Sequence, residues 1–178
     1  MSDVLIRRAV KEDAQALATV RVIGWHQSYA GLMPVELLSK LSIDADRMRI
    51  EKAFADPENR ALRFVAEQHK NIIGMGVCGR LRMGEIEGRG EVYALYLLAE
   101  AKRKGTGRAM MEKMAQALMD EGCTSLQLSV LENNAPARAF YEKLGGVLMR
   151  KGFFKYEGFE LPDVTYVWDD IQQLARKP

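Results

Sequence analysis

A short run of basic residues and glycines has the composition of an anion-binding turn. Residues 102–108 read Lys-Arg-Lys-Gly-Thr-Gly-Arg and stand between an apolar strand and a long amphipathic helix. Glycines at 105 and 107 would let the backbone approach a phosphate closely. The free N–H groups at the start of the helix point at such a ligand, and the helix dipole adds about 0.3 to 1 kcal/mol. The run predicts a phosphate site, with a solvated basic helix cap as the alternative.

Two familiar phosphate motifs do not fit this run. A P-loop ends in Gly-Lys followed by Ser or Thr, and a dinucleotide fingerprint needs a third glycine where Met110 stands. A nucleotide held here is therefore held in some other way.

The elements around the run predict a strand-helix-strand crossover. Residues 91–98 form an apolar strand, and residues 107–122 place apolar side chains at three-to-four spacing until Gly122 ends the helix. A strand over 126–130 follows, so these two strands are expected to be parallel. A short helix over 135–144 comes next, with Asn134 as its N-cap.

The rest of the chain supplies the other strands and helices. A first strand over 4–8 leads into a helix from about 11 to 29, and two shorter helices follow near 34–41 and 44–54. Further strands are expected at 62–66, 72–78, 147–156 and 161–168. The predicted fold class is α/β (α+β), with a mixed, mostly antiparallel central sheet of about seven strands and helices on both faces.

Composition limits the possible functions. The chain has 178 residues, 48% of them hydrophobic and 28% charged, which predicts one globular domain over 1–178. A net charge of +2 argues against a dedicated nucleic-acid binder. The longest apolar run, Val92–Ala99, is too short for a membrane span, and the charged N-terminus does not resemble a secretory signal, so we expect a cytoplasmic protein. The two cysteines and two histidines have no metal-ligand spacing, which predicts reduced thiols and no metal site.

Three motifs in chain order resemble the GNAT superfamily of N-acetyltransferases, which use acetyl-CoA. They are Leu95-Tyr96-Leu97, then Lys102-x-x-Gly105-x-Gly107, then Asn134-x-x-Ala137-x-x-x-Tyr141-x-x-x-Gly145. The chain departs from the family pattern at Lys102, where Arg or Gln is usual, and at Gly145-Gly146, where Gly-Phe is usual. Because lysine lacks the planar fork of arginine, we expect the pyrophosphate to be held mainly by backbone N–H groups.

The resemblance implies where the cofactor lies. The strand over 91–98 is expected to splay from the strand over 126–130, with the pantetheine arm in the gap and paired with exposed backbone. The implied cofactor-binding residues are Leu95, Tyr96 and Leu97 for pantetheine, Arg103, Lys104, Gly105, Thr106, Gly107 and Arg108 for pyrophosphate, and Asn134 and Tyr141. For Asn134, a plain N-cap is the alternative.

The resemblance also implies two catalytic residues. Tyr141 matches a tyrosine close to the thioester sulfur and is the expected general acid, whereas packing beside Phe140 is the alternative. An amine acceptor also needs a base, and Glu91 matches the glutamate of the family's histone acetyltransferases. In an unbroken strand Glu91 shares the face of Leu95 and Leu97, towards the gap; a β-bulge would reverse that phase. The rival bases are Glu85, Glu87 and His26.

The N-terminal half resembles one GNAT branch through Trp25, Tyr29, Gly31, Leu32 and Pro34. In that branch this helix lines the acceptor side, so Trp25, His26 and Tyr29 are the expected substrate residues. The alternative is that Trp25 and Tyr29, four residues apart on one helix face, belong to the core.

Together these features predict an acetyl-CoA-dependent N-acetyltransferase. The acetyl group would pass directly to a small amine, a polyamine or a peptide or protein amine, with coenzyme A as the product. A non-catalytic acyl-CoA sensor or partner-binding module on the same fold is the alternative. A nucleic-acid or membrane partner is not expected, and the last strands and tail could form a homodimer contact.

Overall fold

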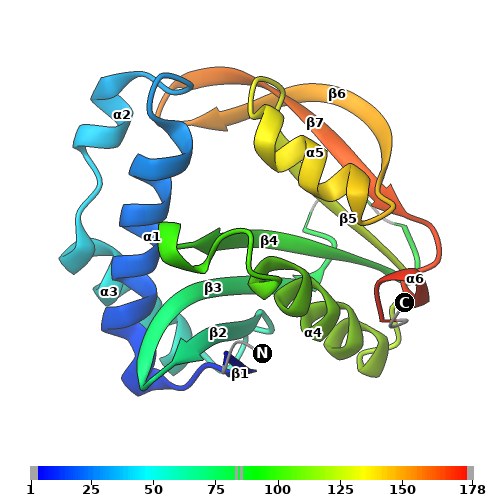
Figure 1. Ribbon diagram of the computed structural model, residues 1–178, viewed down its shortest axis with the longest axis horizontal. Helices are drawn as coiled ribbons and strands as arrows, with labels where there is room; N and C mark the ends of the chain where they lie inside the picture. The colour runs from blue at the N-terminus through cyan, green and yellow to red at the C-terminus, as the bar shows by residue number, and fades with distance from the viewer. Residues whose placement is uncertain (1–3, 83, 85, 176–178) are drawn as a thin grey trace.

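The computed structural model describes residues 4–82, 84 and 86–175. Seven strands form one sheet in the order β1-β2-β3-β4-β5-β7-β6, with β4–β5 as the parallel pair among antiparallel neighbours (Figure 1). The strands are β1 (Leu5–Arg8), β2 (Leu62–Gln68), β3 (Asn71–Arg80), β4 (Arg89–Leu97), β5 (Ser125–Leu131), β6 (Val147–Tyr156) and β7 (Phe159–Trp168). The predicted fold class and the parallel crossover are confirmed.

Helices cover both faces of the sheet (Figure 1). The helices are α1 (Ala14–Tyr29), α2 (Val35–Ser39), α3 (Ile43–Ala55), α4 (Thr106–Asp120), α5 (Ala135–Lys143) and α6 (Gln172–Ala175), with 3-10 turns at Lys11–Asp13 and Ala99–Ala101. The sequence did not predict α6, because its four residues are too few to show periodicity. Burial of Leu174 against the core holds that turn in place. No helix among the described residues is long and apolar enough to cross a membrane.

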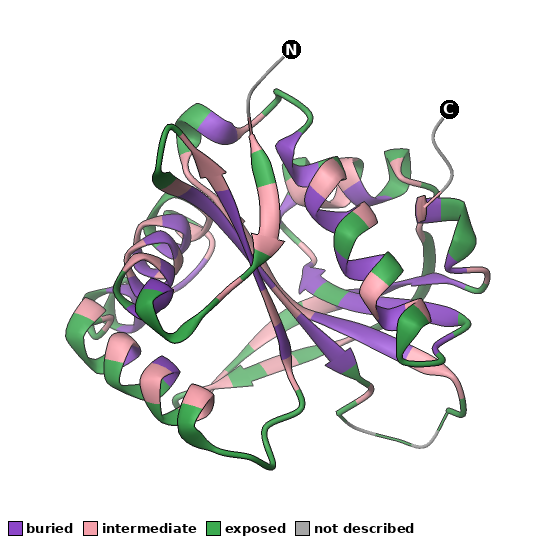
Figure 2. Ribbon diagram, turned by 90° about the horizontal axis from the view of Figure 1, so that it is seen from below, coloured by how far each residue is buried: buried purple, intermediate pink, exposed green. Residues whose placement is uncertain are grey.

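Two layers of apolar side chains hold the helices against the sheet, one on each face. Figure 2 marks the buried residues of the helices and strands in purple. On one face Met110, Met111, Met114 and Leu118 of α4 are fully buried, as the three-to-four spacing predicted. On the other face, Leu17 of α1 and Ile50 of α3 pack with strand residues such as Val65 and Met75. The sheet thus separates an α4–α5 side from an α1–α3 side.

The parallel strands β4 and β5 pair over only three residues. Arg89 pairs with Ser125, Gly90 with Leu126 and Glu91 with Gln127, after which the two strands diverge (Figure 1). Beyond Glu91, the edge of β4 that faces β5 has no strand partner among the described residues. The expected splay between these strands is therefore present, and it leaves a length of backbone open.

A β-bulge in β4 changes which way Glu91 points. Val77 of β3 pairs with Ala94 while Cys78 pairs with Val92, so Tyr93 is an extra residue in β4. Leu95 and Leu97 pack on the α4–α5 side, whereas Glu91 pairs with Gly79, whose missing Cβ would meet Tyr93 on the α1–α3 side. The expectation that Glu91 shares a face with Leu95 and Leu97 is wrong, because it held only for an unbroken strand.

Candidate functional site

A cavity of about 100 Å³ lies where β4 and β5 separate. We call it the gap cavity. Its walls come from both strands and from the start of α5, and of the predicted cofactor residues they include Leu95, Tyr96, Asn134 and Tyr141. Leu97 lies further along β4 and packs against Gly74 and Gly107. The structure thus brings the β4 motif and the α5 motif to one opening.

The start of α4 has the geometry of an anion site. Gly105 is the N-cap residue at φ +86°, and the first intrahelical bond runs from Ala109 N–H to the Gly105 carbonyl, at 3.0 Å. The N–H groups of Thr106, Gly107 and Arg108 have no place in the helical ladder. Thr106 is 3% exposed, and its hydroxyl oxygen is buried with no hydrogen-bond partner among the described residues. A phosphate oxygen accepting from these groups would satisfy the orphaned donors.

Glycine is needed at the two positions of this turn for different structural reasons. Gly105 adopts a left-handed conformation that side chains disfavour, although nothing lies within 4 Å of its would-be Cβ. Gly107 instead lies under Phe140, whose ring would be 3.1 Å from an added Cβ. Gly105 therefore serves the turn itself, and Gly107 serves the contact between α4 and α5.

Asn134 and Tyr141 bring polar groups of α5 to the gap cavity. The Asn134 side-chain oxygen accepts a bond from the Ala137 N–H at 3.3 Å, so the residue caps the helix and only its amide N–H groups are left for a ligand. Tyr141 packs against Phe140, with ring centroids 5.1 Å apart, and is 9% exposed. Burial, and secondarily the neighbouring Tyr96, raise the pKa of Tyr141 above its ordinary value of 10.0. The phenol therefore stays protonated throughout the neutral range.

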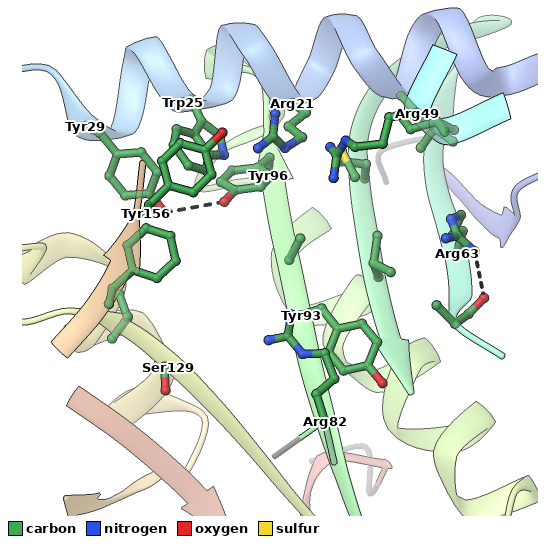
Figure 3. Close-up of a pocket in the computed structure, with 18 of the residues that line it drawn as sticks. Arg21, Trp25, Tyr29, Arg49, Arg63, Arg82, Tyr93, Tyr96, Ser129 and Tyr156 are labelled. Carbon is green, nitrogen blue, oxygen red and sulfur yellow. Dashed lines mark hydrogen bonds between the residues drawn. The ribbon is translucent and has the colours of Figure 1, made fainter. Parts of the chain in front are cut away.

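A second cavity, of about 400 Å³, lies on the other side of the gap, between the sheet and helices α1 and α3 (Figure 3). We call it the helix-side cavity. It shares six lining residues with the gap cavity, so the two are adjacent where β4 and β5 part; these residues are Tyr29, Tyr93, Ala94, Tyr96, Ser129 and Val130. The two cavities therefore have a common wall.

Aromatic rings form one wall of the helix-side cavity (Figure 3). Trp25 lies 5.3 Å from both Tyr29 and Tyr156, measured between ring centroids, and Phe154 stacks on Tyr156 at 5.8 Å. Trp25 is only 4% exposed, and its indole N–H is buried near the Tyr96 hydroxyl without a hydrogen bond of normal geometry. Trp25 and Tyr29 are thus both cavity wall and packed core, which unites the two readings of the sequence.

His26 does not join this wall. It is exposed on α1 and lines neither cavity. The residues of α1 that do line the helix-side cavity are Leu17, Arg21, Trp25 and Tyr29, which repeat every four residues on one helix face. His26 is one step, about 100°, away from that face. The structure therefore places His26 away from both cavities.

Glu91 lies on the helix-side face but is not a wall of the cavity. Its carboxylate accepts three bonds from Arg82, from the backbone N–H at 3.1 Å, Nε at 3.2 Å and Nη2 at 2.7 Å. Arg82 itself lines the cavity, with its guanidinium 4.3 Å from the centre of the Tyr93 ring. Of the rival bases, Glu87 is exposed on the loop before β4, and Glu85 lies outside the described residues.

Several polar residues of the helix-side cavity were not predicted from the sequence. They are Arg21, Arg49, Arg63, Arg82, Ser129 and Asp163. Arg21 could have been found, because it precedes Trp25 by four residues on the same helix. The others come from separate elements and carry no local signal. Burial raises the pKa of Asp163, and Arg150 partly opposes that shift.

Comparisons with known proteins agree with this arrangement. Residues 24–146 match the model of the acetyltransferase (GNAT) family. The chain is 32% identical over 175 residues to the uncharacterized N-acetyltransferase YuaI of Bacillus subtilis (strain 168), covering 96% of each chain.

Two solved structures share the fold. The PaiA N-acetyltransferase of Thermoplasma acidophilum, in complex with coenzyme A, superposes with a TM-score of 0.71 at 20% identity, covering 92% of this chain and 98% of that one. The acetyltransferase YncA of Salmonella typhimurium, with its cofactor acetyl-CoA, gives 0.67 at 15% identity, covering 93% and 92%. With the family match over most of the chain and the relative matched along its length, this protein belongs to the GNAT family of acetyltransferases, whose cofactor is acetyl-CoA.

Proposed function

We propose that this chain binds acetyl-CoA in the gap cavity and transfers the acetyl group directly to an amine in the helix-side cavity. The observation that carries the proposal is the common wall of the two cavities, six residues that include Tyr96 and Ser129, at the point where β4 and β5 separate. Leu97, further along β4 than the gap cavity, packs against Gly107 at the start of α4, and the helix-side cavity offers a separate space for an acceptor. When bound, acetyl-CoA supplies the acetyl group as an activated thioester.

Different groups of residues would hold the pyrophosphate and the pantetheine of the cofactor. Backbone N–H groups of residues 106–108 and the Thr106 hydroxyl would bind the pyrophosphate, and Arg103, Lys104 and Arg108 would add positive charge. The open edge of β4 at Leu95, Tyr96 and Leu97 would pair with the pantetheine amides as an added strand does. The Asn134 amide N–H groups would complete that end of the gap cavity.

Tyr141 is the proposed general acid. It lines the gap cavity, and its raised pKa keeps the proton on the phenol at neutral pH. Its role is to donate that proton to the departing thiolate, whose ordinary pKa is about 8.5. The rings of Phe140, Tyr166 and Trp168 pack around Tyr141 and hold the phenol in place, so packing supports this role.

The acceptor ammonium must lose a proton, and Glu91 is the proposed base. It lies on the face of the sheet that carries the helix-side cavity, behind Arg82, so a proton would reach it through water. A second carboxylate is favoured by a separate observation, because Asp163 itself lines the cavity and burial raises its pKa. A less acidic carboxyl group is a better acceptor of protons near neutral pH.

Direct transfer needs no acylated side chain. Both cysteines are free and buried, and neither lines the two cavities. Burial raises the pKa of the Cys78 thiol to about 12 and also raises that of Cys123. A buried thiol that keeps its proton is a poor nucleophile, so the amine itself is the proposed attacking group.

Calorimetric titration with acetyl-CoA, coenzyme A and ATP tests the cofactor, and thiol release with a panel of amines then tests the transfer. We expect micromolar binding of both coenzyme A species, none of ATP, and amine-dependent thiol release. Binding without release for any amine would support the acyl-CoA sensor instead. Absence of coenzyme A binding would reduce the start of α4 to a basic helix cap.

A further inference from the structure

One end of the helix-side cavity carries an excess of positive charge. Arg49 of α3 and Arg63 of β2 line this end, and Arg21 of α1 lies between them and the aromatic wall, with its guanidinium 4.6 Å from the centre of the Trp25 ring (Figure 3). Each comes from a different element, so the fold, and not a local basic run, brings them together.

Two of these three guanidinium groups share one carboxylate. Asp46 accepts a bond from Arg21 through one oxygen and from Arg49, at 3.0 Å, through the other. No acidic side chain of the described residues pairs with Arg63, which donates only to the Asn59 side-chain oxygen and the Ala61 carbonyl. The positive charge at this end is therefore only partly balanced.

Arg63 is half-buried, with an aromatic ring on one side of its guanidinium and other arginines nearby. Its guanidinium lies over the Phe54 ring, 5.3 Å from the centroid. Burial lowers the pKa of Arg63, and the nearby Arg49 and Arg8 lower it further. Since a guanidinium stays charged in proteins, an anion beside it would relieve an unfavourable field.

We propose that the acceptor is an amine that also carries an oxyanion, a carboxylate or a phosphate, bound by Arg49 and Arg63. The inference rests on the proposed function, since it names the acceptor class for the same cavity. The amine end would lie near Ser129 and Tyr96, where the cavity meets the gap cavity, and the oxyanion at the α3–β2 end. Planar arginine forks suit both oxyanions, because each can accept two parallel N–H bonds.

This assignment sets a simple polyamine apart from the acceptors considered so far. A diamine would bring a second positive charge to the end of the cavity that already holds the guanidinium groups of Arg49 and Arg63. Like charges at short range repel, and burial strengthens that repulsion. The apolar walls from Leu17, Ile50 and Met75 suit a short alkyl chain between the two polar ends.

Matched amines of equal length test the proposal. Aminohexanoate, its neutral amide, diaminohexane and an aminoalkyl phosphate would be compared by thiol release, with shorter chains of each type. A charge-assisted bond contributes enough to predict a preference of about tenfold to a hundredfold in kcat/KM for the oxyanion amines over the amide. The better of carboxylate and phosphate identifies the natural group. Equal or faster reaction of diaminohexane, or no reaction of any oxyanion amine, would overturn the assignment.

Variants locate the effect. Arg63→Gln should lower kcat/KM for the oxyanion amines much more than for the neutral amide, and Arg63→Lys should restore part of the oxyanion preference. Arg60→Gln is the matched control, because Arg60 is an exposed arginine nearby that does not line the cavity. A thermal melt of each variant excludes unfolding. An unchanged preference in folded Arg63→Gln would refute the role of Arg63.

A binding measurement separates this proposal from the cofactor proposal. Titration of the protein with acetylated aminohexanoate and with its amide, with and without coenzyme A, reports on the cavity even if no transfer occurs. We expect tighter binding of the carboxylate, lost in Arg63→Gln but not in Arg60→Gln. Failure of acetyl-CoA to bind would contradict the proposed function alone. Equal binding of the carboxylate and the amide would contradict the oxyanion site alone.

Discussion

The two cavities that meet between β4 and β5 are built in different ways. Apart from Ser28 and Tyr29 of α1, the residues of the gap cavity and of the α4 turn come from one stretch of chain, residues 92–141, and the α4 turn offers mainly backbone N–H groups. The helix-side cavity is built from side chains of α1, α3 and β2 through β7, which are far apart in sequence. A backbone site depends on turn and strand geometry, whereas a side-chain site can change with single substitutions.

This difference predicts that changes in the two cavities have different effects on the reaction. The gap and the α4 turn fit the cofactor of the whole family, which the motifs in that stretch already indicate. The arginines and aromatic rings of the helix-side cavity act through their side chains. Changes to the gap should therefore affect all acceptors alike, and changes to the helix-side cavity should affect them selectively.

The largest effect is expected from Gly105→Glu. A side chain at φ +86° and a negative charge beside the free N–H groups of α4 should weaken acetyl-CoA binding by at least about a hundredfold. Calorimetric titration measures the loss. Gly122→Glu is the matched control, because Gly122, just beyond the other end of α4, has φ +84° and also nothing within 4 Å of its would-be Cβ.

Both glycine variants should lose a similar free energy of unfolding, about 1 to 2 kcal/mol for a left-handed residue. Only Gly105→Glu should lose cofactor binding. If Gly122→Glu lost binding equally, the effect would come from strain in α4 and not from the anion site.

Tyr141→Phe should lower kcat by about a hundredfold or more and leave acetyl-CoA affinity nearly unchanged. The rate with every acceptor should fall by the same factor, because the phenol serves the cofactor side. Tyr166→Phe is the control, since its ring lies 6.3 Å from Tyr141 but its hydroxyl is bonded to Glu142 and Arg138. Steady-state kinetics with two unrelated amines would reveal an acceptor-dependent loss, which would contradict the general-acid role.

The pH dependence of the same reaction sharpens the assignment of Tyr141. Because burial raises the pKa of this phenol above 10.0, it keeps its proton up to that pH and can still donate it. The wild-type kcat should therefore show no decline from loss of this proton between pH 8 and 10. A decline in that range that disappears in Tyr141→Phe would mean that the phenol ionises normally.

Glu91→Gln and Asp163→Asn should have smaller and unequal effects, and they decide which carboxylate is the base. The variant that removes the base should lose about ten- to a hundredfold in kcat/KM and lose the fall in rate on acidification. Burial raises the pKa of Asp163, so a fall caused by this group would have its midpoint above the ordinary aspartate value of 3.8. If both variants keep the wild-type pH profile, water or another group takes the proton.

The fold was predictable from the sequence because its elements follow local patterns. The Met110, Met111 and Met114 stripe marks α4, and the strand-helix-strand order fixes the parallel β4–β5 pair. The bulge at Tyr93 was not predictable, because it arises from how β3 and β4 pair and not from a single strand's alternation. That one inserted residue places Glu91 on the α1–α3 side.

The residues of the candidate site were predictable where they follow a local motif and not where they meet only in the folded chain. Asn134 and Tyr141 lie where the motif spacing placed them, in the gap cavity, since α5 carries both. Arg49, Arg63 and Asp163 meet only in the folded chain, so no spacing reveals them. Their contribution can be argued only from tertiary contacts, which is why the acceptor class did not follow from the sequence.

The smallest effect is expected at His26, the one predicted substrate residue that points away from the helix-side cavity. His26→Ala should leave kcat/KM within about twofold and the free energy of unfolding within about 0.5 kcal/mol, because its exposed side chain makes no contact with either cavity. Tyr29→Phe, on the cavity face of the same helix, removes the hydroxyl that lies 3.5 Å from that of Tyr96 and should raise KM for the acceptor severalfold. Kinetics of the two variants with one amine compare the two faces of α1, and a larger loss in His26→Ala would place the acceptor on the outer face of the helix.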